Sequence, residues 1–198
     1  ASELVERLTK GNRPIPQFTS CCPAWVKYVE TYYPEMREHI SSAKSPIGMQ
    51  GPTIKTYFAQ KMGIDPEKIV NVAVTPCTAK KYEIRREEMH AAGSYLGIEG
   101  MRDMDYCITT RELARWAREE NIDFLTLGDE PYDSFMGEGS GAGVIFGNTG
   151  GVMEAALRTA YNLVTGKNPD PDAFKVVRGL GDGPWTVSYT HLTLPTIA

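Results

Sequence analysis

The sequence predicts an α/β fold in which small, mostly parallel sheets are flanked by helices. Residues 69–74 read Ile-Val-Asn-Val-Ala-Val, an apolar and β-branched run that is typical of a strand buried on both faces of a parallel sheet. Helical and strand-like patterns alternate along the chain, as they do in α/β domains. The length of 198 residues suffices for one substantial domain or for two small lobes that share a core.

The remaining elements follow from apolar periodicity and from start and stop signals. Thr109 and Glu112 have the spacing of a capping box, which predicts that a helix begins there. Trp116 and Leu163 are expected on the packed faces of their helices. In chain order the predicted helices cover 3–10, 23–33, 35–40, 53–62, 78–83, 85–95, 110–120 and 152–165, and further strands cover 106–108 and 174–177.

Composition and charge exclude several classes of protein. The net charge is −4 and no run of Lys or Arg occurs, so we expect no nucleic-acid-binding surface. No apolar run reaches membrane-spanning length, so no membrane insertion is expected. The chain begins at Ala1 within a helical pattern, so we expect the natural N-terminus to be missing; a cytoplasmic location is the working expectation. Four unevenly spaced cysteines indicate a reduced protein with a metal or redox site.

The rest of the chain is organised around the stretch Thr-Ser-Cys-Cys-Pro-Ala-Trp at 19–25. Pro23 suits the first turn of a helix, so Cys21 and Cys22 should lie at or near a helix N-terminus. Free N–H groups and the helix macrodipole favour negative charge there, and the thiolate is the form of cysteine that binds metal. A strained disulfide, a buried pair of inert thiols and two thiols with different roles all remain open.

A second cysteine-bearing stretch directly follows the predicted strand over 69–74. The run Thr75-Pro76-Cys77 passes into a helical turn, which is where α/β folds place their sites. Lys80 lies one turn beyond Cys77 on the same side; it is either an ordinary solvated lysine or a donor to an anionic cofactor held by the thiol. Cys107 falls within a predicted strand and is expected to be a small core residue.

Residues 137–151 contain seven glycines in fifteen residues. Gly137-x-Gly139-x-x-Ala142 loosely matches the dinucleotide fingerprint, but an acidic loop precedes it where a buried strand is required. A glycine-rich wall that lets the backbone approach a bulky cofactor is the better interpretation. The credible thiol ligands are one short of a closed four-ligand site, since they are only Cys21, Cys22 and Cys77.

Three motifs together resemble the catalytic domain of iron-only (FeFe) hydrogenases, from about residue 2 to about residue 182. They are Thr-Ser-Cys-Cys-Pro-Ala-Trp at 19–25, Thr-Pro-Cys-Thr-Ala-Lys-Lys-Tyr-Glu at 75–83, and Gly-Ala-Gly-Val-Ile-Phe-Gly-Asn-Thr-Gly-Gly-Val-Met-Glu-Ala-Ala at 141–156. The resemblance implies two lobes, each with a small sheet flanked by helices, that close on a buried H-cluster. This cluster is a 4Fe–4S cubane joined through a cysteine sulphur to a two-iron unit with CO and cyanide ligands.

The resemblance also implies an activity and partners. The family reaction is the reversible conversion of two protons and two electrons to H2, with electrons from ferredoxin or a similar carrier. H-cluster maturation proteins are the other implied partners.

Residue by residue, the resemblance implies that Cys22 and Cys77 are cubane ligands and that Cys21 passes protons to the two-iron unit. Lys80 matches the lysine that hydrogen-bonds a cyanide ligand. The remaining implied residues are the cluster-pocket positions Ser45 and Pro46 and the proton-path positions Ser41 and Glu3.

Two features depart from the family pattern. Thr75 stands where the family usually has Met, which predicts a more polar pocket. The third cluster motif, a Cys-x-x-x-Cys loop, is missing, since no cysteine follows Cys107. We therefore expect a partial catalytic domain over 1–186, incomplete at both ends, that binds no complete H-cluster and has no hydrogenase activity. Residues 187–198 are expected to be a non-native, adaptor-like tail.

Two other classes of function remain open. A hydrogenase-like protein for sensing or for iron–sulphur assembly would bind a cubane without producing H2, although the Cys21–Cys22 pair argues against the assembly branch. A thiol-redox or dinucleotide-binding protein would instead bind a nucleotide without iron.

Overall fold

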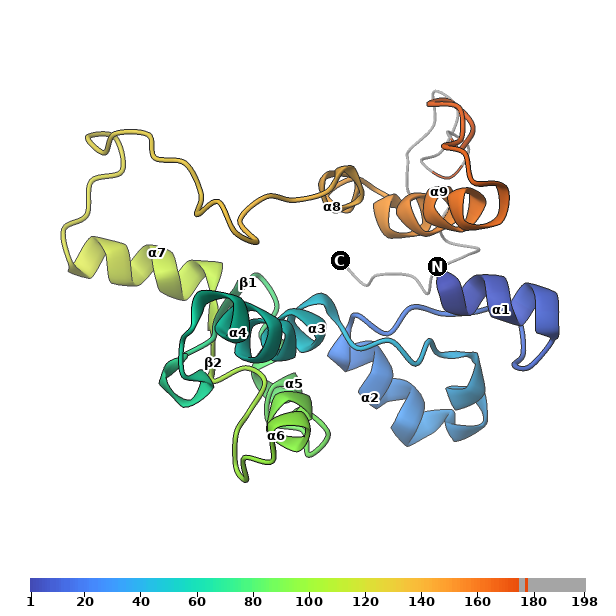
Figure 1. The fold of residues 1–198 in the computed structure, drawn as a ribbon, viewed down its shortest axis with the longest axis horizontal. Coiled ribbons are helices and arrows are strands. Elements are labelled where there is room, and N and C mark those ends of the chain that lie inside the picture. Colours follow the sequence, from blue (N-terminus) through green and yellow to red (C-terminus); the bar gives the residue numbers. More distant parts are fainter. Residues whose placement is uncertain (175–176, 178–198) are drawn as a thin grey trace. The chain divides into compact units, whose positions relative to one another are not determined.

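The structure is a computed structural model that describes residues 1–174 and residue 177. The chain divides into two compact units (Figure 1). The central unit is Ile15–Glu130, and the terminal unit combines Ala1–Pro14 with the chain from Pro131 onward. The expected tail over 187–198 lies outside the described residues, as do residues 175 and 176 of the predicted strand over 174–177.

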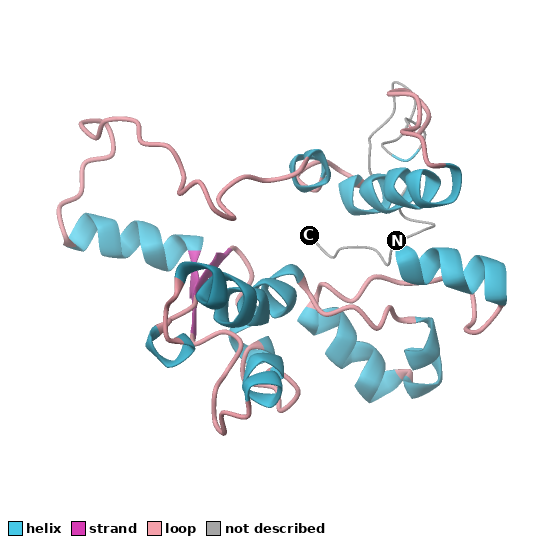
Figure 2. Ribbon diagram, in the orientation of Figure 1, coloured by secondary structure: helices cyan, strands magenta, loops and turns pink. Residues whose placement is uncertain are grey.

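The elements of the central unit alternate as an α/β fold requires. Its helices and strands are α2 (Pro23–Tyr32), the 3-10 helix η1 (Pro34–His39), α3 (Pro46–Thr53), the π-helix η2 (Ile54–Phe58), α4 (Ala59–Met62), the 3-10 helix η3 (Pro66–Lys68), β1 (Val72–Thr75), α5 (Lys80–Glu83), α6 (Ala91–Leu96), β2 (Tyr106–Thr109) and α7 (Thr110–Glu119). Figure 2 shows the two strands in magenta among these helices.

The sheet of the central unit pairs β1 with β2 in parallel. Ala73 lies opposite Cys107, and both side chains join a buried cluster with Ile84 and Met104. The crossover between the strands runs through α5 and α6, because parallel strands cannot be joined by a tight turn. The predicted α/β class with a small parallel sheet is confirmed.

The expectation that the first strand is buried on both faces is wrong. Ala73 is 6% exposed, whereas Val72 and Val74 are each 50% exposed. Successive side chains of a strand point to opposite faces, and only one face of this two-stranded sheet carries the buried cluster.

Helix boundaries in the central unit follow from local hydrogen bonds. The capping box is confirmed, since Thr109 Oγ1 accepts from the Glu112 N–H at 3.1 Å and Glu112 Oε2 accepts from the Thr109 N–H at 2.7 Å. The helix predicted over 85–95 begins only at Ala91, because the buried Asp103 carboxylate accepts from the N–H groups of Ala91 and Ala92. Trp116 was expected to pack inward but is 57% exposed.

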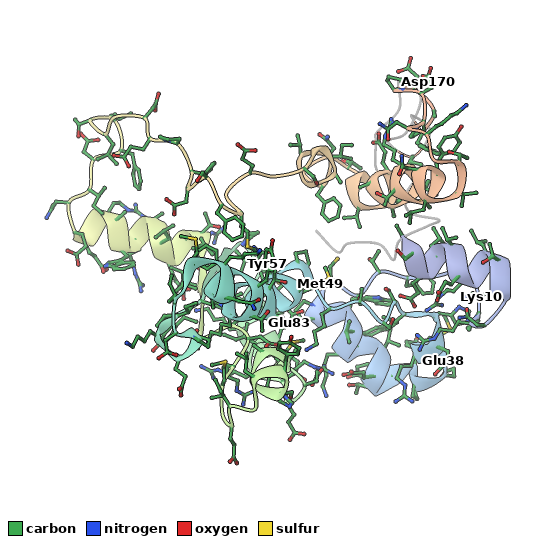
Figure 3. The ribbon with its side chains drawn as sticks, viewed as in Figure 1. Lys10, Glu38, Met49, Tyr57, Glu83 and Asp170 are labelled. Carbon is green, nitrogen blue, oxygen red and sulfur yellow. The ribbon has the colours of Figure 1, made fainter. Side chains whose placement is uncertain are left out.

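The segment predicted as a helix over 53–62 is longer and less regular than its sequence pattern indicates. Helical structure begins at Pro46, and the π-helical turn η2 interrupts it. Within this turn Lys55 is buried, and its Nζ donates at 2.8 Å to both the Arg102 carbonyl and Asp105 Oδ1. Tyr57, labelled in Figure 3, is about half exposed.

The terminal unit holds α1 (Ser2–Lys10), α8 (Gly141–Ile145) and α9 (Gly151–Thr165), and α1 contacts α9. An ion pair runs along α9, with Arg158 Nε and Glu154 Oε1 at 2.9 Å. The packed face of α9 differs from the expected one, because Glu154 and Ala155 are buried while Leu163 is 54% exposed. Across the described part of both units, none of the helices has the length and apolarity needed to cross a membrane.

Candidate functional site

The first cysteine motif lies where the sequence predicts, at the N-terminus of α2. Cys22 is the N-cap residue, and its Sγ accepts a hydrogen bond from the Trp25 N–H at 3.5 Å. Pro23 occupies the first turn, so the remaining free N–H groups of that turn face the cysteines. Cys21 is half-buried, and its Sγ lies 4.0 Å from Thr19 Oγ1. Both thiols are free, which excludes a disulfide between them in this structure.

The loop after η1 lies beside this motif. Phe18 and Ile40 form an isolated parallel bridge, in which the Phe18 N–H donates to the His39 carbonyl and the Ser41 N–H donates to the Phe18 carbonyl, both at 2.8 Å. Ser20 Oγ donates to the Ala43 carbonyl. The Ser41 backbone is therefore attached to the stretch that leads directly into Cys21, and the role of Ser41 on a proton path stays a prediction.

The predicted pocket residues Ser45 and Pro46 begin α3. Ser45 is the N-cap residue, fully buried, and its Oγ accepts from the Gly48 N–H at 3.3 Å. Pro46 is the first residue of the helix. Their geometry shows a structural role as a helix start, and their contact with a cluster stays a prediction.

The second cysteine motif follows β1. The Cys77 N–H donates to Thr75 Oγ1 at 3.4 Å, and the Cys77 carbonyl accepts from the Lys80 N–H at 3.3 Å. The strand thus ends in a tight turn that carries Cys77, as the sequence predicts, and α5 begins three residues later at Lys80. The Thr75 hydroxyl belongs to this turn, where its oxygen accepts the hydrogen bond from the Cys77 backbone.

Lys80 joins the two cysteine motifs. Its Nζ donates to the Cys21 carbonyl at 2.6 Å and to Glu83 Oε2 at 2.7 Å, and both Lys80 and Glu83 are buried. The alternative of an ordinary solvated lysine is wrong. Glu83, labelled in Figure 3, was not identified as a site residue from the sequence, although its i,i+3 spacing from Lys80 on α5 is the signal that could have found it.

Glu3 lies in the terminal unit, apart in the chain from the cysteine motifs. Its Oε1 accepts from the buried Arg7 guanidinium, at 2.7 Å from Nη2, and lies 3.5 Å from Arg13 Nη1. The proton path from Glu3 through Ser41 to Cys21 stays a prediction.

Cys107 behaves as a core residue. It is 8% exposed in the buried cluster behind the sheet, and this burial raises the pKa of its thiol. Its place in this cluster makes it a core residue, as the sequence predicts.

The donor set fits part of an iron–sulphur group. Cys22 and Cys77 are accessible thiols in adjoining motifs, and α2 contacts α5. Among residues 1–174 and 177, however, no three His, Cys, Asp or Glu side chains gather closely enough to hold a metal ion. The described residues thus suit the two positions that these motifs would supply and leave a four-ligand cubane site incomplete.

The dinucleotide alternative lacks its structural context. In the described region that precedes the glycine-rich run, residues 120–140 form turns and loop without a strand. Within the run, Ser140 is the N-cap of the short helix α8. A dinucleotide fingerprint instead links a buried strand to a helix.

Known proteins are similar to this chain along most of its length. Residues 1–190 match the family described as "Iron only hydrogenase large subunit, C-terminal domain". The "Periplasmic [Fe] hydrogenase large subunit" of Nitratidesulfovibrio vulgaris is 56% identical over 180 residues, which are 90% of this chain and 41% of that protein. The "Cytosolic Fe-S cluster assembly factor NAR1" of Sclerotinia sclerotiorum is 34% identical over 209 residues, covering 92% of this chain and 37% of that protein.

Solved structures of hydrogenases show the same similarity to this chain. An apo [FeFe]-hydrogenase HydA1 variant from Chlamydomonas reinhardtii superposes with a TM-score of 0.69 at 45% identity, over 85% of this chain and 41% of that one. The chain spans less than half the length of these relatives. With both cysteine motifs in place and this similarity along the chain, it belongs to the iron-only hydrogenase large subunit family, in its C-terminal domain.

Proposed function

We propose that the protein to which this chain belongs interconverts two protons and two electrons with H2 at an H-cluster, of which this chain holds one part. The observation that carries the proposal is the Lys80 ammonium, which ties the Cys21–Cys22 motif to the Cys77 motif through the Cys21 carbonyl. Cys22 and Cys77 would hold the cubane. When bound, the cluster would pass on electrons from the carrier and supply the metal centre at which protons are reduced.

The other residues have separate roles in this proposal. Cys21 would hold a proton at Sγ and deliver it into the site, with Ser41 and Glu3 supplying protons from the surface. An ammonium has three N–H donors, and the two bonds to the Cys21 carbonyl and Glu83 leave one for an anionic ligand of the cluster. Ser45 and Pro46 would line the pocket, and ferredoxin or a similar carrier and the maturation proteins would be the partners.

Reconstitution tests this proposal. The 198-residue chain is incubated anaerobically with iron and sulphide, and its iron content, visible absorbance and H2 evolution with a reduced dye are measured. We expect no stable 4Fe–4S cluster and no H2, because the chain supplies two of the four cubane thiolates. Uptake of about four irons per chain that survives Cys22→Ala and Cys77→Ala would show that these ligand assignments are wrong.

The second part of the test uses a protein in which this chain is joined to the remainder of a related domain. It should evolve H2 after maturation and lose this activity in Cys22→Ala, whereas Cys107→Ala should keep it. Cluster binding without H2 evolution would favour the second candidate, a sensory or assembly protein, which the 34% identity to an assembly factor supports.

Cell fractionation tests the location. The cytoplasmic location expected from the sequence is a proposal, and a relative that is 56% identical is named as periplasmic. Recovery of the natural protein in the periplasmic fraction would contradict it.

A further inference from the structure

A second tie joins α2 to the bend that follows α5. Glu30 lies two turns into α2, and Arg86 follows α5. Arg86 donates through Nη1 to Glu30 Oε2 at 2.9 Å and through Nη2 to Glu30 Oε1 at 2.6 Å. This paired geometry fixes the direction as well as the distance between the two groups, which a single-point ion pair does not.

The Arg86 side chain is itself held on several sides. Its guanidinium carbon lies 5.9 Å from the centre of the Tyr82 ring, and its Nε donates to Glu88. The Arg102 guanidinium donates to the Arg86 carbonyl at 3.0 Å. The side chains of Arg86 and Glu30 are only 18% and 29% exposed, so this pair is shielded more than an ordinary surface ion pair.

The two ties act at different distances from the thiols. Lys80 holds the N-terminal end of α2 through the Cys21 carbonyl. Glu30 lies about 12 Å along the helix axis from Cys22, at about 1.5 Å per residue. With Lys80 alone, α2 could pivot about its N-terminal end. The paired hydrogen bonds between Arg86 and Glu30 are a second tie at this distance, and they oppose a rotation of α2 about the end that carries Cys22.

We propose that the Glu30–Arg86 pair is a positioning clamp that sets Cys22 relative to Cys77 so that both thiols can bind one metal centre. The proposal rests on the proposed function in one respect, namely that these two thiols are joint ligands. Neither Glu30 nor Arg86 would touch the metal.

Cadmium binding tests the clamp without any enzymatic activity. Cd²⁺ is titrated into the anaerobic chain on a Cys21→Ala background, and binding is followed by the ultraviolet thiolate-to-cadmium absorbance. Cys22→Ala and Cys77→Ala identify the bound thiols. The test variants are Arg86→Lys and Glu30→Gln, and the charge-reversed pair Glu30→Arg with Arg86→Glu tests for rescue. Arg115→Gln is the matched control, because its exposed ion pair with Glu119 lies on α7.

Both test variants should bind Cd²⁺ about tenfold more weakly, since changing a group that orients a metal ligand without touching the metal typically costs about ten- to a hundredfold in metal affinity. The absorbance per bound Cd²⁺ should fall toward that of one thiolate, a change that lower stability alone would not produce. The charge-reversed pair should recover part of the affinity and part of the absorbance per bound Cd²⁺. Arg115→Gln should leave both quantities unchanged.

Two results would overturn the proposal separately. If Arg86→Lys binds Cd²⁺ with the affinity and absorbance of the background chain, the clamp is wrong while the ligand assignment survives. If Cys22→Ala or Cys77→Ala leaves the affinity unchanged, the joint-ligand assignment fails and the clamp fails with it.

Discussion

Replacing Lys80 with Met should be among the most destabilising single substitutions in the central unit. The substitution removes the ammonium group that pairs with the Glu83 carboxylate, whose side chain is 5% exposed. It also removes the donor to the Cys21 carbonyl. A buried ion pair that loses one partner costs about 3–5 kcal/mol, and an unmade hydrogen bond adds about 1 kcal/mol. Because domains are stable by only about 5–15 kcal/mol, Lys80→Met should lose a large share of the folding free energy.

A double-mutant cycle separates this effect from simple loss of side-chain volume. Lys80→Met, Glu83→Met and the double variant are unfolded in urea and followed by circular dichroism. The double variant should be more stable than the sum of the single losses predicts, by about 2–4 kcal/mol, because it leaves no unpaired buried charge. Lys10→Met, which breaks an exposed pair with Glu6, is the control and should cost less than about 1 kcal/mol. A loss below about 1 kcal/mol for Lys80→Met would refute the reasoning.

Three further predictions concern the helices around the sheet. Thr109→Ala removes the N-cap acceptor of α7 and should cost about 1 kcal/mol in urea unfolding, whereas an unchanged midpoint would show that the box is dispensable. The hydrogen bond from Lys81 lowers the pKa of Glu112 from 4.5 to about 2. The stabilisation from the ionised Glu112 carboxylate is therefore fully present above pH 4.5 and is lost as the pH falls through 2. In Glu112→Gln the free energy of unfolding should vary less with pH over that window. Gly51→Ala would place a Cβ against the Asp103 carbonyl oxygen, closer than van der Waals contact allows, and should lower the melting temperature through a loss of about 1–3 kcal/mol, which an unchanged melting curve would contradict.

The elements that local sequence determines were predicted well. The capping box at Thr109, the strand around Ala73 and the helix start at Pro23 each depend on residues within a few positions of one another. The same holds for the placement of Cys22 at an N-cap and of Cys77 just after a strand.

The elements that depend on distant partners were not predictable. Helix α6 begins where Asp103, more than ten residues later, supplies its acceptors. Whether Lys80 is solvated or buried depends on its hydrogen bond to the carbonyl of Cys21, which lies 59 residues away in sequence. Trp116 and Leu163 follow helical periodicity, yet each is more than half exposed, because periodicity identifies a face without identifying what packs against it.

The parallel register of the sheet has a consequence for the order of folding. Asn71 and Asp105, just before the strands, are hydrogen-bonded across 34 residues of intervening chain, so the strands can pair only after a long loop has closed. Closing such a loop costs conformational entropy before the strand contacts that offset this cost have formed, so folding is slow. Cys77 sits at the end of the strand that depends on this closure, whereas Cys22 needs only the first turn of its own helix. We therefore expect the thiol of Cys22 to reach its native surroundings early and that of Cys77 late, so that pulsed hydrogen exchange during refolding should protect the backbone amides of α2 before those of β1.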